Sequence, residues 1–385
     1  MMGSTDIREI FNESTFPVPV DKHRIFIFNQ IWERLSEPGY WWNAKEKAAL
    51  VEIIRNAKRP EIFDRKRKSV AELSSQSYEG LIPPLVADTI ERIVTEPGDL
   101  DRKWAVDVID KIGEGPYAEL IAIVILLMPI DLFTTYLGMD HIPLSSPQHG
   151  DALKSYPDNL VDNGAWIRQT QEAVDNLQLV NVSRALSILP YDNTLRRTLV
   201  DAMYMEKHSF FDKVWKNKAL SRPQLEILAT KTSAINKCFY CAAGHSAIFT
   251  LTAKKAGQSG DFGFLYGKGK DSNVPHADFL LEIAEKANRE PQSLSELRPK
   301  IEKVFGQKGM VEIFSVIAIF NGLNRTSDPS GVPLEPVLLA ALGKKIEYAG
   351  LDSFAGVKRV TRPKGLKRLQ VLIAFKLRRI LGKGQ

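Results

Sequence analysis

Four side chains in the second half of the chain have the types and spacing that thiol redox chemistry needs. They are Glu226, Cys238, Cys241 and His245, separated by eleven, two and three residues. A thiolate is the nucleophile in such chemistry, and its surroundings must bring its pKa towards neutrality. Two cysteines separated by two residues can also close a disulfide across one helical turn. One sulfur would then attack an oxidant, and the other would resolve the sulfenic acid.

A helix that begins near Cys238 would hold these groups together. Asn236 favours a helix start just before Cys238, and the alanines that follow Cys241 favour helix continuation. Cys238, Cys241 and His245 then share one helix face. First-turn amides favour an anion at Cys238, whereas His245, one turn beyond Cys241, can exchange protons with Cys241. Glu226, on the preceding helix, could act as a base or hold the imidazole.

The same four residues match a known pattern. Their order and spacing resemble the motif of the alkylhydroperoxidase D-like proteins of the carboxymuconolactone decarboxylase superfamily. The resemblance covers about residues 199–335, including Lys255 to Gly257 and Phe320 to Arg325, and is weaker over 28–143.

The resemblance implies an all-α fold and a dithiol that reduces alkyl hydroperoxides. Cys241 would be the peroxidatic cysteine, Cys238 the resolving one, and Glu226 and His245 the proton relay. The dipole argument favours Cys238 as the anion instead; we expect Cys241, because His245 lies one turn away. Family members often have a second histidine just before the second cysteine. This chain has Tyr240 there, a candidate pocket residue.

The rest of the chain is predicted to be mostly helical. Apolar residues recur at three-to-four spacing, and no Asn-Gly or Asp-Gly hairpin signal joins alternating strands. Helices are expected at residues 22–35, 41–57, 86–94, 101–111, 117–127, 167–177, 195–215, 225–235, 238–255, 277–287, 297–305 and 310–323. Residues 145–164 are turn-rich and suggest a linker, and residues 257–274 suggest a second long loop.

Two halves of the chain have the pattern of diverged copies. The segment from Phe28 to Trp32 is similar to that from Phe211 to Trp215. Gly113 precedes Glu119 by six residues, as Gly306 precedes Glu312. We therefore predict two tandem helical domains of this family. Residues 1–150 form a degenerate copy without cysteines, residues 151–345 carry the CxxC site, and residues 346–385 form a basic amphipathic tail. The cysteine segment aligns near Glu61, Asp64 and Lys68 of the first copy.

Composition narrows the protein class. The chain has 385 residues, of which 44% are hydrophobic and 25% charged, values typical of a globular protein and not of a disordered one. Two cysteines exclude a disulfide scaffold. The N-terminus has no secretory signal, and the most apolar run, Leu120 to Pro129, is too short to span a membrane. A cytoplasmic location is expected.

The basic residues are concentrated at the C-terminus. Residues 358–385 hold ten lysines or arginines and no acidic residue, so the rest of the chain is mildly acidic despite the net charge of +6. This distribution argues against a general nucleic-acid-binding surface. Leu366, Leu369, Ile373, Phe375, Leu377 and Ile380 alternate with basic residues. The tail could bind an anionic membrane surface or an acidic partner, or pack on its own protein.

Two further hypotheses remain open. The chain could be a redox-sensing or scaffold protein without useful turnover, or a zinc-binding module that uses Cys238, Cys241, His245 and a fourth ligand such as Glu226 or water. No motif implies an organic cofactor. The peroxidase hypothesis implies a hydroperoxide substrate and an external thiol reductant, either a protein or a small dithiol. It is compatible with a monomer containing an internal pseudo-dimer or with a small homo-oligomer.

Overall fold

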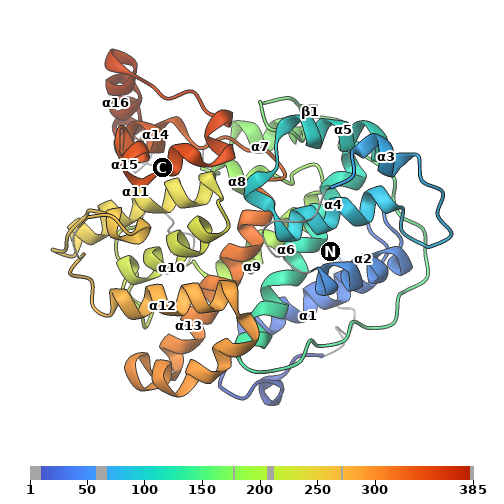
Figure 1. The fold of residues 1–385 in the computed structure, drawn as a ribbon, viewed down its shortest axis with the longest axis horizontal. Helices are drawn as coiled ribbons and strands as arrows, with labels where there is room; N and C mark the ends of the chain where they lie inside the picture. Colours follow the sequence, from blue (N-terminus) through green and yellow to red (C-terminus); the bar gives the residue numbers. More distant parts are fainter. Residues whose placement is uncertain (1–9, 58–66, 177, 206–211, 270–271, 382–385) are drawn as a thin grey trace.

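The computed structural model confirms the all-α prediction. It describes residues 10–57, 67–176, 178–205, 212–269 and 272–381, with side chains up to residue 373. In these ranges the only strands are β1 (Leu160–Val161) and β2 (Gln169–Thr170), an antiparallel pair in which Leu160 faces Thr170. Everything else is helix or connecting loop (Figure 1).

The helices divide along the chain into three groups. The first comprises α1 (Lys22–Ser36), α2 (Ala44–Asn56), α3 (Val70–Ser74), α4 (Pro84–Thr95), α5 (Arg102–Ile112) and α6 (Glu114–Tyr136). Between the halves lie α7 (Gln171–Asp175), α8 (Asn181–Arg184) and α9 (Pro190–Met203). The second half comprises α10 (Arg222–Ile235), α11 (Phe239–Lys255), α12 (Ala277–Arg289), α13 (Arg298–Ser327), α14 (Pro336–Leu342), α15 (Lys345–Ala349) and α16 (Gly365–Leu381). Short 3-10 turns occupy Glu13–Thr15, Pro97–Asp99, Gly263–Tyr266, Pro291–Leu297, Leu351–Ser353 and Ala355–Arg359.

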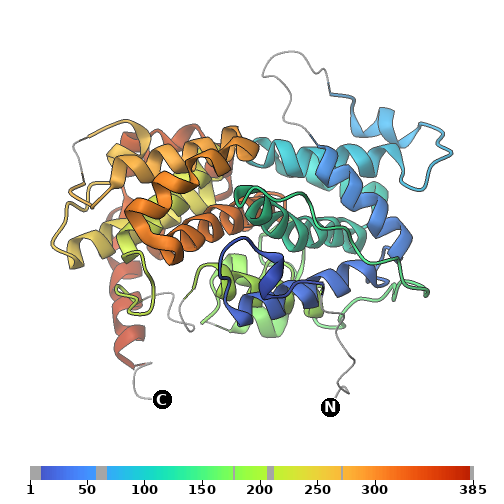
Figure 2. The same cartoon turned by 90° about the horizontal axis from the view of Figure 1, so that it is seen from below.

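The two halves meet along α6 and α13. These long helices pack against each other, and α9 packs on α1, α6 and α13. Figures 1 and 2 show α1–α5 on one side of this pair and α10–α12 on the other. One apolar core runs through both sides, from Phe11 and Trp32 to Phe320 and Leu351. The predicted domain boundary at residue 150 therefore separates sequence segments that share a core.

Two helical stretches are long and apolar enough to cross a membrane, Glu114–Tyr136 and Pro291–Ser327. However, 89% and 72% of their most apolar windows are buried inside the protein. Buried core helices have the same length and composition. These two stretches therefore do not indicate a membrane location, and the cytoplasmic location remains a prediction.

The entrances to α6 and to the long part of α13 are built alike. Gly113 and Gly306 both have positive φ, +94° and +69°, a conformation that favours glycine. Six residues later, Glu119 and Glu312 accept backbone N–H bonds from the loops before α2 and α10. Glu119 receives those of residues 40–42 at 3.1, 2.5 and 3.2 Å. Glu312 receives those of residues 219 and 220 at 2.9 to 3.0 Å.

The starts of α2 and α10 also correspond. Asn43 caps α2 in a capping box with Glu46, and Ser221 caps α10 in a capping box with Gln224. These parallels support the predicted duplication, which remains a prediction. The first-copy residues Glu61 and Asp64 lie outside the described ranges, as does Phe211 of the second copy.

Three helix predictions need correction. The expected helix at 167–177 is reduced to α7, because residues 169 and 170 pair with β1 instead. The expected helix at 195–215 starts earlier, with Pro190 at its first position, and ends at Met203 because Tyr204 leaves helical geometry (φ −133°). Asn236 is not the N-cap of α11. It ends α10, its amide donates to Asn321 and Asn324, and Cys238 is the N-cap.

The basic tail forms the expected helix, α16. It packs on α14 and projects from the second half (Figure 2), and Nε of Arg368 donates to the Ala340 carbonyl at 2.7 Å. Leu366, Leu369 and Ile373 are 71%, 54% and 49% exposed. The side chains of Phe375, Leu377 and Ile380 lie outside the described part. A membrane surface or acidic partner for this exposed face stays a prediction.

Candidate active site

The packing of α10 against α11 brings the predicted relay residues together. Glu226 lies on α10 and His245 on α11, and Oε2 of Glu226 is 2.7 Å from Nδ1 of His245. The Glu226 side chain is fully buried, and that of His245 is 10% exposed. The pKa of Glu226 is lowered in spite of burial, because Arg222 and His245 stabilise its charge. A carboxylate can only accept, so Nδ1–H of His245 is the donor.

Two residues without a motif signature hold the other carboxylate oxygen. The Tyr204 hydroxyl donates to Oε1 of Glu226 at 2.5 Å, and Nε of Arg222 lies 2.7 Å from the same oxygen. The Arg222 guanidinium lies over the Trp215 ring, 3.4 Å from its centroid. Burial raises the pKa of Tyr204, so its hydroxyl stays protonated as a donor. Glu226 is therefore an ionised, oriented carboxylate in an apolar interior.

Cys241 and His245 line one cavity. The cavity has a volume of about 340 Å³, and Tyr204 and Tyr240 also line it. Cys241 is 3% exposed, and its Sγ is 3.5 Å from the Ser327 hydroxyl. Because His245 follows Cys241 by one helical turn, the imidazole and the sulfur lie on the same side of α11. The cavity thus combines a thiol, an imidazole and an apolar wall.

Cys238 lies outside that cavity, in a buried charged environment. The Asp328 carboxyl group and Cys241 are its neighbours there, and both influence its pKa. Burial, first of all, together with the bond to Cys241 and the Asp328 charge, raises its pKa. The first-turn position therefore does not make Cys238 the more anionic sulfur.

Asp328 is in turn held by the C-terminal part of the chain. Its Oδ1 is 2.9 Å from Nη1 of Arg359, and Arg359 also donates to the Leu100 carbonyl at 3.1 Å. Burial outweighs this arginine and raises the pKa of Asp328 to about 6. The Arg359 guanidinium lies 4.5 Å from the centroid of the Trp166 ring. Three distant segments therefore meet at Asp328, next to Cys238: the first half at Leu100, the residues just after the predicted linker at Trp166, and the C-terminal region at Arg359.

Tyr240, at the position of the missing histidine, is a wall residue. Its hydroxyl donates to Oε1 of Glu335 at 2.8 Å and accepts from the Val182 N–H at 3.2 Å. Burial raises its pKa well above the ordinary value. Tyr240 therefore links α11 to the loops at Val182 and Glu335, and the tyrosine stays neutral.

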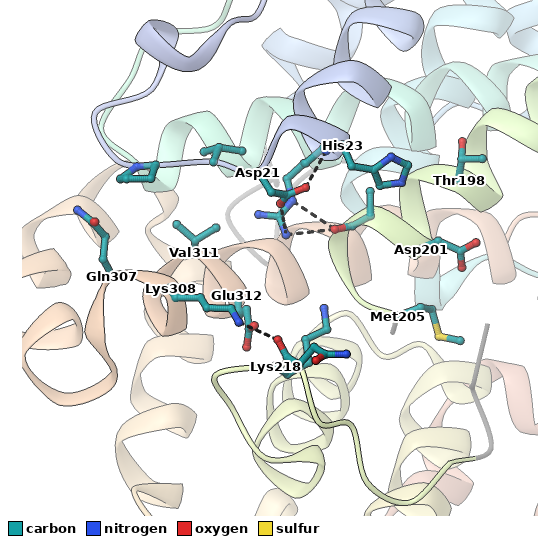
Figure 3. Close-up of a pocket in the computed structure, with 15 residues that line it drawn as sticks. Asp21, His23, Thr198, Asp201, Met205, Lys218, Gln307, Lys308, Val311 and Glu312 are labelled. Carbon is teal, nitrogen blue, oxygen red and sulfur yellow. Dashed lines mark hydrogen bonds and ion pairs between the residues drawn. The ribbon is translucent and has the colours of Figure 1, made fainter. Parts of the chain in front are cut away.

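A second, larger hollow adjoins the thiol cavity. Its volume is about 820 Å³, and Figure 3 shows it between the start of α1, the end of α9 and α13. Asp201 and Met205 line both cavities. His23 and Glu312 contribute to the second hollow from opposite halves of the chain. The end of α9 thus forms a common wall between the two spaces.

The motif residues were predicted from the sequence, but the residues that hydrogen-bond to them or neighbour them were not. Arg222 had a partial signal, because it precedes Glu226 by four residues, about one helical turn; however, the predicted helix began at residue 225, whereas α10 begins at Arg222. Tyr204, Ser327 and Asp328 had none. Among the described residues, no group of three or more His, Cys, Asp or Glu side chains is placed to hold a metal. His245 uses Nδ1 for Glu226, and both cysteines are free thiols.

Comparison with known proteins identifies no relative of the chain. No protein-family model, curated protein or solved structure matches the chain. The resemblance to alkylhydroperoxidase D-like proteins therefore rests on the sequence motif alone and stays a prediction.

Proposed function

We propose that the chain is a dithiol peroxidase that reduces organic hydroperoxides, similar to the alkylhydroperoxidase D-like proteins. The observation that carries this proposal is the bond between ionised Glu226 and Nδ1–H of His245, in a cavity wall shared with Cys241. A carboxylate fixes the tautomer and orientation of a catalytic imidazole in this way. A purely structural histidine would not need a buried carboxylate that is itself held by an arginine and a tyrosine.

The first step oxidises Cys241. His245 accepts the Cys241 proton, and the thiolate attacks the outer oxygen of the hydroperoxide. The S–O bond forms as the O–O bond breaks, and the imidazolium returns the proton to the departing alkoxide. The products are the sulfenic acid of Cys241 and an alcohol. Glu226 stabilises the transient imidazolium, since the pair becomes an ion pair when His245 is protonated.

The second step uses Cys238. Its sulfur attacks the sulfenic sulfur of Cys241, the S–S bond forms, and hydroxide leaves and takes up the Cys238 proton as water. Asp328, whose charge acts on the Cys238 thiol, is the neighbouring base that would accept that proton first. An external dithiol then reduces the disulfide by thiol–disulfide exchange and is itself oxidised. The protein returns to the two free thiols.

A thiol count with intact mass tests the proposal. Reduced protein is measured before and after one equivalent of cumene hydroperoxide. We expect the loss of two thiols, a mass decrease of two hydrogens and one equivalent of alcohol. Unchanged thiols would overturn the proposal. The same measurement on the Cys241→Ser variant should leave the remaining thiol intact, which controls for non-specific oxidation.

The two other hypotheses give different results in this experiment. A redox sensor would form the disulfide once but would show no steady-state consumption of peroxide when dithiothreitol is supplied. A zinc module would show bound metal in the native mass of the starting protein. Steady turnover by the metal-free protein would exclude both.

A further inference from the structure

The thiol cavity contains a buried cation without a carboxylate partner. Arg196, on α9, is 1% exposed and lines the cavity that contains Cys241. Its Nε and Nη2 donate to Oδ1 of Asn193 at 3.1 and 3.0 Å, and Nη2 also donates to the Ser183 carbonyl at 2.8 Å. Within the described ranges, no carboxylate forms an ion pair with this guanidinium, and Nη1 has no hydrogen-bond partner.

This arrangement costs stability in the empty protein. Burial of a charge without an ion-pair partner is unfavourable. Burial, together with the neighbouring charge of Arg197, lowers the pKa of Arg196 to about 9, although the charge of Asp201 acts in the opposite direction. Arg222, the other buried arginine of the site, is paired with Glu226. An anion in the cavity would give Arg196 the partner that Arg222 already has. A guanidinium with one free nitrogen suits a carboxylate.

The remainder of the cavity is largely apolar. Side chains that form this wall include Leu179, Val200, Ile248, Leu334 and Leu338. Ligand cavities with apolar walls and a few placed polar groups bind amphiphilic molecules in a fixed orientation. Here one polar group is the Cys241–His245 pair, where the reaction takes place. Another is Arg196.

We infer that Arg196 binds the carboxylate of the substrate, which is a hydroperoxide with an aliphatic chain and an acid end, as in fatty-acid hydroperoxides. The reaction part of this inference rests on the proposed function, but the binding part does not. Arg196 is then a specificity residue, because it selects the acid over an ester or an alcohol of the same length.

Other charged groups line the same cavity and bear on this binding. Arg197 adds a second positive charge, whereas Asp201 and Glu335 are acidic. Oε1 of Glu335 accepts bonds from Tyr240 and from the Asn181 N–H, while Oε2 is buried without a partner. Burial raises the pKa of Glu335, which reduces its repulsion of a bound carboxylate. Ionisation of Glu335 at higher pH should therefore weaken the binding of the acid.

Calorimetry on the reduced full chain tests the binding part. Decanoate and decanol are the probes, because they share a chain and differ in charge. We expect decanoate to bind at least tenfold more tightly than decanol. Arg196→Gln should lose this preference, and Arg196→Lys should recover part of it. Arg102→Gln, which changes an exposed arginine on α5, is the matched control and should behave as the wild type.

Two results would overturn the binding part. One is equal affinity of the wild type for both probes, which needs no variant and so does not depend on whether Arg196→Gln folds. The other is an equal loss of both probes in a folded Arg196→Gln protein, which would indicate a structural role alone.

Kinetics separate this inference from the proposed function. A straight-chain hydroperoxy acid is compared with its methyl ester. Arg196→Gln should raise KM for the acid at least tenfold and leave kcat and the ester unchanged. Turnover of acid and ester with equal kcat/KM would overturn the inference while the peroxidase proposal stands. Decanoate binding that depends on Arg196, without turnover of any hydroperoxide, would overturn the proposed function and keep the binding site.

Discussion

The starts of α2 and α10 have the same capping arrangement, but the buried charged side chains near them contact different partners. In the first half, Nζ of the buried Lys47 donates to the carbonyls of Arg34 and Glu37 at 2.6 and 3.0 Å, and Arg34 pairs with Asp192 at 2.6 Å. These charges are directed at backbone or at one another. Five positions after the cap of α10 stands Glu226, where α2 has Ala48. Glu226 is directed at His245 beside a cavity.

The ends of α6 and α13 differ in the same way. Thr134 and Thr135 return their hydroxyl groups to carbonyls of α6, at Ile130 and Asp131. The corresponding residues after Glu312 are Ser327 and Asp328. Ser327 also donates its hydroxyl to a carbonyl of its own helix, that of Leu323, but its oxygen lies 3.5 Å from Sγ of Cys241 as well. Asp328 pairs with Arg359 and is a neighbour of Cys238. Most buried polar groups of a folded protein have hydrogen-bond partners. The two helix ends differ in that Ser327 and Asp328 lie beside the two thiols, whereas Thr134 and Thr135 contact only carbonyls of α6.

The largest expected effect separates the two cysteines, which have no counterpart among the described residues of the first half. Cys241→Ser should lower peroxide turnover at least about 1000-fold, because none of the other described residues that line the cavity carries a thiol. Cys238→Ser should reduce one equivalent of peroxide and then stop, with the mass of one added oxygen. Stopped-flow and intact mass measure both. A one-equivalent burst from Cys241→Ser, with no burst from Cys238→Ser, would reverse the assigned roles.

The next effect compares two buried glutamates. Glu226→Gln removes the anion that holds His245 and leaves Arg222 unpaired, so kcat/KM should fall about 100-fold and the free energy of unfolding by about 3–5 kcal/mol. Glu119→Gln should cost about 1–3 kcal/mol through weakened N–H bonds, with unchanged kcat/KM per folded molecule. Urea unfolding and steady-state assays provide both quantities. An equal loss of kcat/KM in the two variants would mean that Glu226 has no greater part in catalysis than Glu119.

The smallest expected effect is a pH dependence at Asp328. The pKa of this carboxyl is about 6 in the folded chain and 3.8 as its ordinary value, so the folded state holds a proton between these pH values that the unfolded state has released. Stability from this group therefore falls as pH rises through that window, by about 3 kcal/mol. Asp328→Asn should remove this slope and slow disulfide formation.

Thr135→Ala, at the corresponding position of α6, provides the control for that measurement. Urea unfolding at a series of pH values should give it the wild-type slope. If Asp328→Asn also kept the wild-type slope and the wild-type rate of disulfide formation, Asp328 would have no part in either property.

The sequence predicted those parts of the site that depend on local spacing. Helix periodicity fixes the common face of Cys241 and His245, and the packing of consecutive helices is enough to bring Glu226 to His245. Tyr204 could not be predicted, because it reaches Glu226 by leaving α9 one residue after Met203. Arg196 and Asp328 are separated from the cysteines by many residues and several loops. No fixed sequence spacing therefore predicts that they lie near the thiols. The strand pair of residues 160–161 and 169–170 was also missed. It depends on a contact between two separate segments, which replaced the start of the helix predicted at 167–177.

The bond between Arg359 and Asp328 has a consequence for the order in which the protein is made. Synthesis runs from the N-terminus, so Cys238 and Cys241 leave the ribosome more than a hundred residues before Arg359 does. Until then Asp328 lacks its cation. The two cysteines are therefore made before the arginine that holds Asp328, and the surroundings of Cys238 are complete only after Arg359 has been translated.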